Sequence, residues 1–177
     1  MTSATSSRTA TRSADNLTLA VTTAQVPLDR GTMIFEWIQR PVPAVTGGNV
    51  LVFGGIGNTF DNTIYVWRTG NNSVGASYRS GGVAGSLLTR PCTFVAGTTY
   101  RFGVAWATGR MAACIDGSTI TSGTTDITPL ASAARIAVGM PPYGASSTGT
   151  LSNAVHRAFV YAPVTASDAL LQQLTAP

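Results

Sequence analysis

Short apolar stretches separated by turn residues run through most of the chain, and this spacing restricts the fold more than any single motif does. From Asn16 onwards the stretches recur at intervals of about 10–15 residues, with Gly, Asn or Pro between them, which is typical of an all-β sandwich. The clearest signal lies between Thr98 and Trp106, where every second residue is apolar and large or branched. This alternation predicts a strand with one heavily apolar face, made of Tyr100, Phe102, Val104 and Trp106.

Further strands are expected wherever a similar stretch ends at turn residues. Gly54-Gly55 is expected to close the strand that starts at Val50, and Thr69 to Asn72 to connect a hairpin. The expected strands are Leu17 to Thr22, Thr32 to Ile38, Val50 to Phe53, Thr63 to Arg68, Ser73 to Arg79, Thr98 to Trp106, Met111 to Ile115, Arg135 to Val138 and Ala154 to Tyr161. About ten short strands predict two packed antiparallel sheets.

One helix is expected, close to the C-terminus. Leu170, Leu171 and Leu174 fall on one face of a short helical segment, and Thr165 or Ser167 is placed to cap its first turn. Such a helix is too short to be stable alone. It must therefore pack on the sheets.

Residues 1–15 differ from the rest of the chain because they are rich in Ser and Thr and lack an apolar pattern. Such a segment cannot bury enough apolar area to order itself. We therefore expect a polar N-terminal arm, residues 1–15, followed by a single domain over residues 16–177, in line with the length of one ordinary domain. Arg8 and Arg12 in the arm are expected to contribute to attachment on a partner.

Charged side chains make up only 10% of the 177 residues, against about 25% in an average soluble protein. The chain contains Arg but no Lys, and the Arg residues are scattered, so a nucleic-acid groove is not expected. No apolar run approaches the ~20 residues that cross a bilayer. The polar start of the chain lacks the apolar core of a signal peptide, so ordinary secretion is not expected either.

The residues needed for catalysis are scarce. Glu36 is the single Glu and His156 the single His, while Cys92 and Cys114 lack the spacing of a zinc site or a redox pair. Cys92 and Cys114 are therefore interpreted as small core residues, because a disulfide would need an oxidising compartment. His156 is interpreted as a strand residue with a local hydrogen bond rather than a pH sensor. We expect no enzymatic activity.

Four segments together resemble the laminin G-like branch of the concanavalin A-like jelly rolls: TMIFEWIQRP, GTTYRFGVAWATGRMAACIDG, ARIAVGM and GTLSNAVHRAFVYAPVTASDALLQQL. The resemblance covers roughly residues 16–175. It implies a two-sheet antiparallel jelly-roll sandwich, with a role in glycan binding, adhesion or structural display. The opening ATRSADNLTL is similar to the lead-in to such modules in bacteriophage tail and other virion proteins.

The resemblance also suggests where a metal or a catalytic pair would lie. Relatives often bind Ca²⁺ at one rim, and here Asn58, Asp61 and Asn62, with Asp116 or Asp126, supply the nearest oxygen ligands. An Asx-rich turn explains the same residues, so no metal or other cofactor is expected. A glycanase of this fold needs two carboxylates about 5–5.5 Å apart, whereas this chain offers Glu36 and distant Asp residues.

Aromatic side chains beside loops are the candidates for stacking on sugar rings. Trp67, Tyr78 and Tyr143 occupy such positions, although ordinary packing explains each of them as well.

The sequence thus predicts a non-enzymatic structural protein of a bacteriophage particle, a lectin-like jelly roll displayed on the virion surface, on capsid or tail, in a decoration or attachment role. Other virion proteins are its expected partners. We expect self-association in a closed ring such as a trimer, because a weakly charged, apolar-rich composition favours protein contacts over isolated solvation. The alternatives are a glycan-binding module for host adsorption, which would bind a host-surface glycan, and a glycanase of the same fold.

Overall fold

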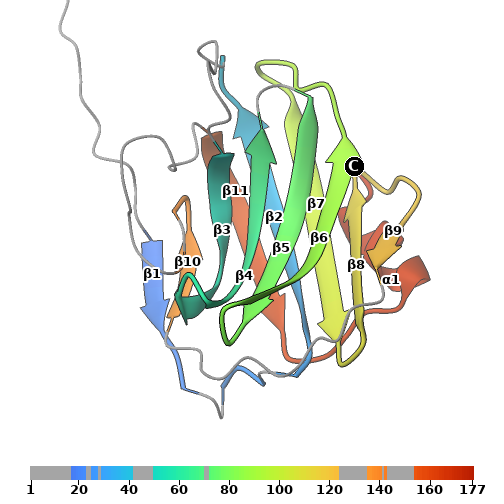
Figure 1. The fold of residues 1–177 in the computed structure, drawn as a ribbon. Coiled ribbons are helices and arrows are strands. Elements are labelled where there is room, and N and C mark those ends of the chain that lie inside the picture. The colour runs from blue at the N-terminus through green and yellow to red at the C-terminus, as the bar shows by residue number, and fades with distance from the viewer. Residues whose placement is uncertain are drawn as a thin grey trace, which may run out of the picture.

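Two antiparallel β-sheets stacked face to face form the body of the protein (Figure 1). The computed structural model describes residues 17–22, 25–27, 29–41, 50–69, 72–123, 135–140, 142 and 154–177. The six-stranded sheet has the order β1 (Leu17–Ala20), β10 (Arg135–Val138), β3 (Val50–Thr59), β4 (Asn62–Thr69), β5 (Ser73–Ser80) and β6 (Val83–Pro91). The five-stranded sheet has the order β11 (Ala154–Ala162), β2 (Gly31–Gln39), β7 (Thr99–Ala107), β8 (Arg110–Ile115) and β9 (Thr121–Gly123). The expected all-β, two-sheet architecture is confirmed.

The core lies between the two sheets and is built from alternate residues of each strand. The apolar face predicted for β7 is confirmed, because Tyr100, Phe102, Val104 and Trp106 are all buried in this core. Rings from the two sheets meet directly, with the centroids of Trp37 and Phe53 4.2 Å apart. Packing of this kind fixes the register of β2 and β7, since a slip of one residue would turn the apolar row to solvent.

The strand that starts at Val50 does not end at Gly54-Gly55, contrary to the expectation. It continues as β3 to Thr59, with a bulge between Val52 and Gly54. Gly54 has a φ of +151°, and a Cβ there would collide with the backbone of Ala137 on β10. The glycine therefore permits a bulge and a close backbone approach within the sheet.

Two strands were not predicted. β6 and β9 contain Gly, Ser and Thr without a clean alternation of apolar residues, which hides them from pattern analysis. β6 is hydrogen-bonded to β5, and it also lies against β9 of the other sheet. The two strands bring the sheets together at one side of the sandwich.

The predicted helix is present as α1 (Asp168–Thr175), and Ser167 rather than Thr165 caps it. The Ser167 hydroxyl accepts a hydrogen bond from the Leu170 backbone N–H, whereas the Thr165 hydroxyl donates to the Trp106 carbonyl. No helix in the described part of the chain is long and apolar enough to cross a membrane.

Helix α1 packs on the outer face of the five-stranded sheet, and Gly103 makes room for it. A Cβ on Gly103 would lie 2.7 Å from side-chain atoms of Leu171 and Thr175. Of the three leucines predicted to share one face, only Leu171 is buried against the sheet, while Leu170 and Leu174 are each 44% exposed. Leu170 and Leu174 lie beside Leu171 and line an apolar groove with Ile34 of β2 and Val160 of β11.

Candidate functional site

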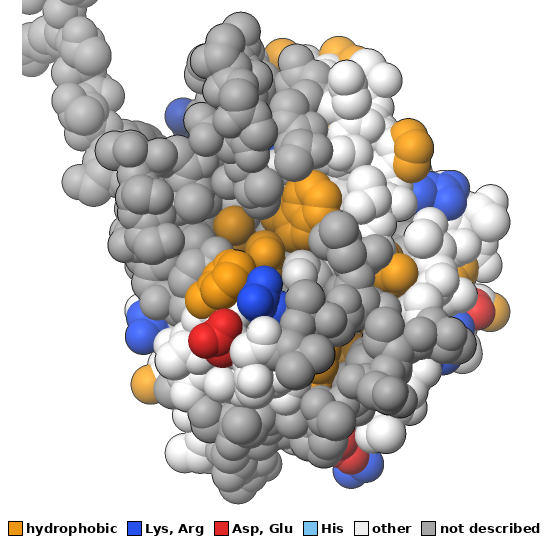
Figure 2. Space-filling view, in the orientation of Figure 1, with side chains coloured by type: hydrophobic (Ala, Val, Ile, Leu, Met, Phe, Trp, Pro, Cys, Tyr) orange, Lys and Arg blue, Asp and Glu red, His pale blue; other side chains and the backbone are white. Residues whose placement is uncertain are grey.

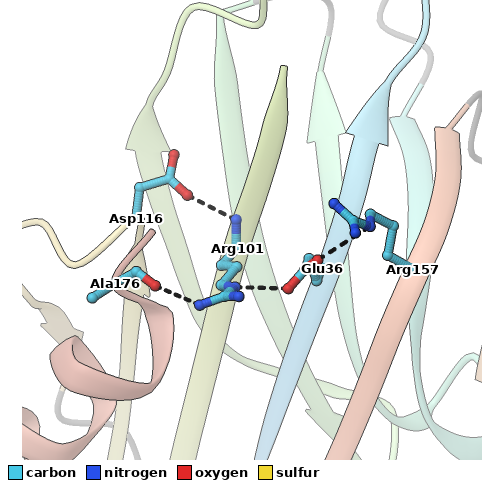
Figure 3. Close-up of polar contacts among 5 residues, drawn as sticks. All are labelled: Glu36, Arg101, Asp116, Arg157 and Ala176. Carbon is cyan, nitrogen blue, oxygen red and sulfur yellow. Dashed lines mark hydrogen bonds and ion pairs between the residues drawn. The ribbon is translucent and has the colours of Figure 1, made fainter. Parts of the chain in front are cut away.

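A cluster of charged side chains lies on the outer face of the five-stranded sheet (Figure 3). Glu36 on β2 is flanked by Arg101 on β7 and Arg157 on β11, since β2 lies between these two strands. Glu36 Oε2 accepts a hydrogen bond from Arg101 Nε at 2.7 Å, and Glu36 Oε1 pairs with Arg157 Nε at 3.5 Å. Both carboxylate oxygens are therefore engaged by guanidinium groups.

Arg101 is held by contacts on several sides. Its backbone N–H donates to Asp116 Oδ1 at 2.7 Å, and its Nη1 donates to the Ala176 carbonyl at 2.6 Å (Figure 3). Ala176 follows the end of α1, where a cation is favourable because of the helix dipole. Burial raises the pKa of Asp116, and the hydrogen bond and the charge from Arg101 counteract this. Arg101 thus ties the β8–β9 turn and the helix to the sheet.

Arg157 is the accessible member of the cluster. Its side chain is 53% exposed, against 16% for Glu36, and it sits where a bulge interrupts the register of β11 between His156 and Ala158. A guanidinium carries five N–H donors. Donors of Arg157 therefore remain accessible to a ligand that approaches this face.

An apolar groove of about 180 Å³ continues the same face towards α1. Ile34 and Glu36 are two residues apart on β2, so both project from the outer face, the first into the groove and the second into the cluster. The lining residues are Thr32, Ile34, Val160, Ala162, Val164, Thr165, Ala166, Leu170 and Leu174. A groove beside exposed guanidinium donors suits a ligand with one apolar face and polar or anionic substituents.

The aromatic residues predicted to stack on sugars are placed differently from the expectation. Trp67 is 7% exposed and its ring lies against Gly75, and Tyr78 is 1% exposed and belongs to the core between the sheets. Burial also raises the pKa of Tyr78 to about 12. The expectation that these two rings are exposed was wrong, because Trp67 is covered beside Gly75 and Tyr78 faces the core. Tyr143 lies outside the described residues, as do Arg8 and Arg12.

The loop considered for Ca²⁺ forms the turn between β3 and β4. Asp61 pairs with Arg79 at 3.8 Å, and Asn62 Oδ1 accepts a hydrogen bond from the Gly81 backbone N–H at 3.0 Å. The Arg79 guanidinium also lies over the Phe60 ring, 4.1 Å from its centroid. These contacts connect the β3–β4 and β5–β6 hairpins, so the residues have structural partners.

Asn58, the third candidate of that loop, lies near the end of β3, and Asp126 lies outside the described residues. Within the described ranges, no three His, Cys, Asp or Glu side chains form a group that could hold a metal ion.

His156 and the two cysteines occupy structural positions. His156 projects towards Phe53 with ring centroids 6.1 Å apart, and burial lowers its pKa to about 4. The side chain is therefore neutral near pH 7. Cys92 and Cys114 are free thiols, with Cys114 buried and Cys92 half-buried. Burial, followed by the charge of Asp116, raises the pKa of Cys92 to about 11, which disfavours the reactive thiolate.

The surface of the six-stranded sheet offers no comparable cluster among its described side chains. Figure 2 shows hydrophobic side chains over the middle of this face, while Arg and acidic side chains occur singly or in small groups. The scattered charge expected from the sequence is visible here. An extended basic track for nucleic acid is not formed by the described residues on this face.

Comparison with solved structures finds proteins of the same fold. The carbohydrate-binding module CBM40 of Ruminococcus gnavus IT-sialidase, bound to α2,3 sialyllactose, matches with a TM-score of 0.65 and 13% identity over 91% of this chain and 98% of that chain. The heptameric SAP-like pentraxin of Limulus polyphemus matches with a TM-score of 0.68 and 10% identity over 91% of this chain and 75% of that one.

A third match is tailspike protein 2 of Escherichia coli O157:H7 bacteriophage CAB120, with a TM-score of 0.60 and 15% identity over 93% of this chain and 24% of that one. No protein-family model matches the sequence, and no curated protein matches it. At these identities the likeness establishes the fold alone. The chain has the concanavalin A-like jelly-roll fold that the sequence motifs implied.

Proposed function

We propose that the protein is a non-enzymatic, lectin-like structural module of a bacteriophage particle, displayed on capsid or tail in a decoration or attachment role. The observation that carries this proposal is the tailspike likeness, in which 93% of this chain corresponds to 24% of a much longer phage protein. A chain of this size is thus comparable to one module of a surface-displayed phage protein. The low charge and the lectin-like fold agree with such a role.

The charges on the outer face support a non-catalytic role. Retaining glycoside hydrolysis needs a free carboxylate nucleophile and a second carboxyl group as acid. Glu36 has both oxygens paired with Arg101 and Arg157, so neither oxygen is free to attack a sugar carbon. We therefore propose that Glu36 orients the two guanidinium groups and carries out no chemistry.

Particle labelling tests the proposal. Gradient-purified particles of the phage that encodes the protein are incubated with an antibody raised against residues 16–177 and examined by immunogold microscopy. We expect gold at one repeated position on capsid or tail. Labelling confined to unassembled protein in the lysate would refute the virion role.

Glycan binding is the second candidate function, and the CBM40 likeness favours it because that module is matched along nearly its whole length. The cluster and the groove lie side by side on one face, so the groove could take the apolar face of a pyranose while Arg157 donates to an anionic or hydroxyl group. We propose an acidic glycan as the ligand on this basis.

A glycan array with matched variants tests this second function. Arg157→Ala removes the accessible donors, and Arg30→Ala is its control because Arg30 is 56% exposed and lies outside the cluster. We expect the acidic-glycan signal to fall at least tenfold in Arg157→Ala and to persist in Arg30→Ala, without hydrolysis of the glycan. Equal binding by both variants would place any glycan site elsewhere.

A further inference from the structure

The two sheets of the sandwich differ in width by one strand. β6 lies against β9 at one side, and β2 packs under β3, where Trp37 meets Phe53. Counting outwards from these contacts places β11 opposite β10. β1 is then left without a strand opposite it in the five-stranded sheet. Figure 1 shows β1 at the edge of the sandwich, beyond β10.

β1 projects two leucines towards the position opposite it, which no described strand fills. Leu17 and Leu19 are paired with Val138 and Ile136 on β10, and paired residues project from the same face of a sheet. Ile136 belongs to the core, so the two leucines also face the level of the second sheet. They are nevertheless 66% and 60% exposed, because no described residue covers them there.

The outer edge of β11, which pairs with no described strand, borders the same position. Within the six-stranded sheet, Leu17 is level with Val138 and Gly54. Across the core, a Cβ on Gly54 would contact the ring of Phe35 on β2. Phe35 is paired with Phe159, so Phe159 on β11 is level with Leu17. The residues of β11 level with β1 are thus 159–162, which follow the bulge and run in regular register. Phe159 and Tyr161 face the core there but remain only half-buried. A slot for one strand of about four to six residues therefore lies beneath β1 and beside β11.

We propose that the N-terminal segment of the same chain, residues 8–13, fills this slot as an additional strand antiparallel to β11. Sixteen residues precede Leu17, and the sheets of a sandwich lie about 10 Å apart. Residues 14–16 suffice to cross that distance at roughly 3.3 Å per residue. Asp15 and Asn16, directly before β1, are residue types that favour a tight change of direction.

The sequence of the segment suits the slot. In Arg8-Thr9-Ala10-Thr11-Arg12, Thr alternates with Arg or Ala, so a strand would turn its Thr methyl groups under the leucines and both Arg outwards. Thr is a favourable strand residue, and outward charge protects a new sheet edge from further pairing. β1 and β11 run in the same direction (Figure 1). A segment that pairs with β11 and then turns back into β1 runs opposite to β1, so it is antiparallel to β11.

The tether favours the chain's own segment over that of a second copy, because a short linker gives an effective concentration in the millimolar range. The sequence predicted that residues 1–15 attach to a partner. In this proposal, part of that segment binds to its own domain instead. This inference does not depend on the virion role or on glycan binding.

Hydrogen exchange of residues 158–162 tests the proposal in the full chain. Thr11→Pro removes a donor from the centre of the strand, and Ser3→Pro is the matched control outside it. We expect the outward amides of β11 to exchange about tenfold faster in Thr11→Pro than in the parent or in Ser3→Pro. Equal exchange in all three proteins would overturn the proposal.

A dilution series distinguishes the source of the strand. Protection that is unchanged between 100-fold different protein concentrations supports the chain's own segment, and protection lost on dilution would assign the strand to a second copy and overturn the proposal.

Burial of the leucines provides a second readout. Leu19→Ala should lower Tm by about 3 °C in the full chain and leave it unchanged once residues 2–13 are deleted. An equal shift in both backgrounds would also contradict the proposal.

Discussion

At the scale of single residues, the candidate site depends on contacts between neighbouring strands that the sequence does not display. Glu36 lies 65 positions from Arg101, and the two meet because β2 and β7 pair with Glu36 opposite Arg101. Parity along the strand could have indicated that Arg101 faces away from Tyr100 and Phe102. The identity of its partner required the strand register. Trp67 and Tyr78 were misplaced for a related reason, since the sequence did not reveal that Trp67 is covered beside Gly75 of the neighbouring strand and that Tyr78 faces the core.

His156 gives a residue-scale prediction for the effect of pH. Its pKa is about 4 in the folded protein and 6.5 in a free side chain, so the unfolded chain binds the proton first as pH falls. Stability should therefore decrease between pH 6.5 and pH 4, by about 2 kcal/mol after allowance for partial exposure. Urea unfolding at pH 7.5 and pH 4.5 measures this loss. The unfolding free energy of His156→Gln should change less with pH over the same interval. An identical pH dependence in the variant and the parent would show that His156 is not the source of the loss.

Phe102 gives a second prediction at this scale. Its ring is fully buried between the sheets, so Phe102→Ala should lower the free energy of unfolding by about 3–5 kcal/mol. Thr99→Val on the same strand is the control, because Thr99 is exposed and Val also suits a strand. Chemical denaturation measures the unfolding free energy of both variants. Equal values for the two would show that Phe102 does not lie in the core.

At the scale of elements, most of the described strands were predicted to within about a residue, and the errors are confined to β3, β6, β9 and the end of β1. β2, β7 and β10 match the expected ranges to within about a residue because one face of each is strongly apolar. β6 and β9 lack that contrast, and Gly54 in β3 was interpreted as a stop although it forms a bulge. A glycine in a strand pattern is compatible with a strand end or with a bulge. At Gly54 the close approach of the β10 backbone requires the glycine inside the sheet, as a bulge.

The packing of α1 supplies the prediction at this scale. Gly103→Val would place methyl groups where Leu171, Thr175 and Ile34 already meet, so the helix must move outwards. We expect a loss of about 1–3 kcal/mol in unfolding free energy, typical of overpacking. Because the Arg101 contact to Ala176 depends on the helix position, a glycan signal should weaken as well. Unchanged stability would show that α1 is not seated on Gly103.

At the scale of the whole molecule, the sandwich displays two kinds of surface. The outer face of the five-stranded sheet combines the Arg–Glu–Arg cluster with an apolar groove, whereas the edge next to β11 leaves β1 without a described strand opposite it. The two-sheet sandwich was predictable because many weak strand and turn signals agree, and the jelly roll was implied by the resemblance of four segments. The position of the cluster was not, because it depends on which strands become neighbours.

The proposed virion role requires a fixed number of copies of the protein in each phage particle, so the copy number is the measurement that decides it. Quantitative mass spectrometry of gradient-purified particles would measure the ratio of this chain to the major capsid protein. We expect a constant ratio across preparations that corresponds to a multiple of the symmetry of capsid or tail. A ratio that falls towards zero with each round of purification would contradict the account.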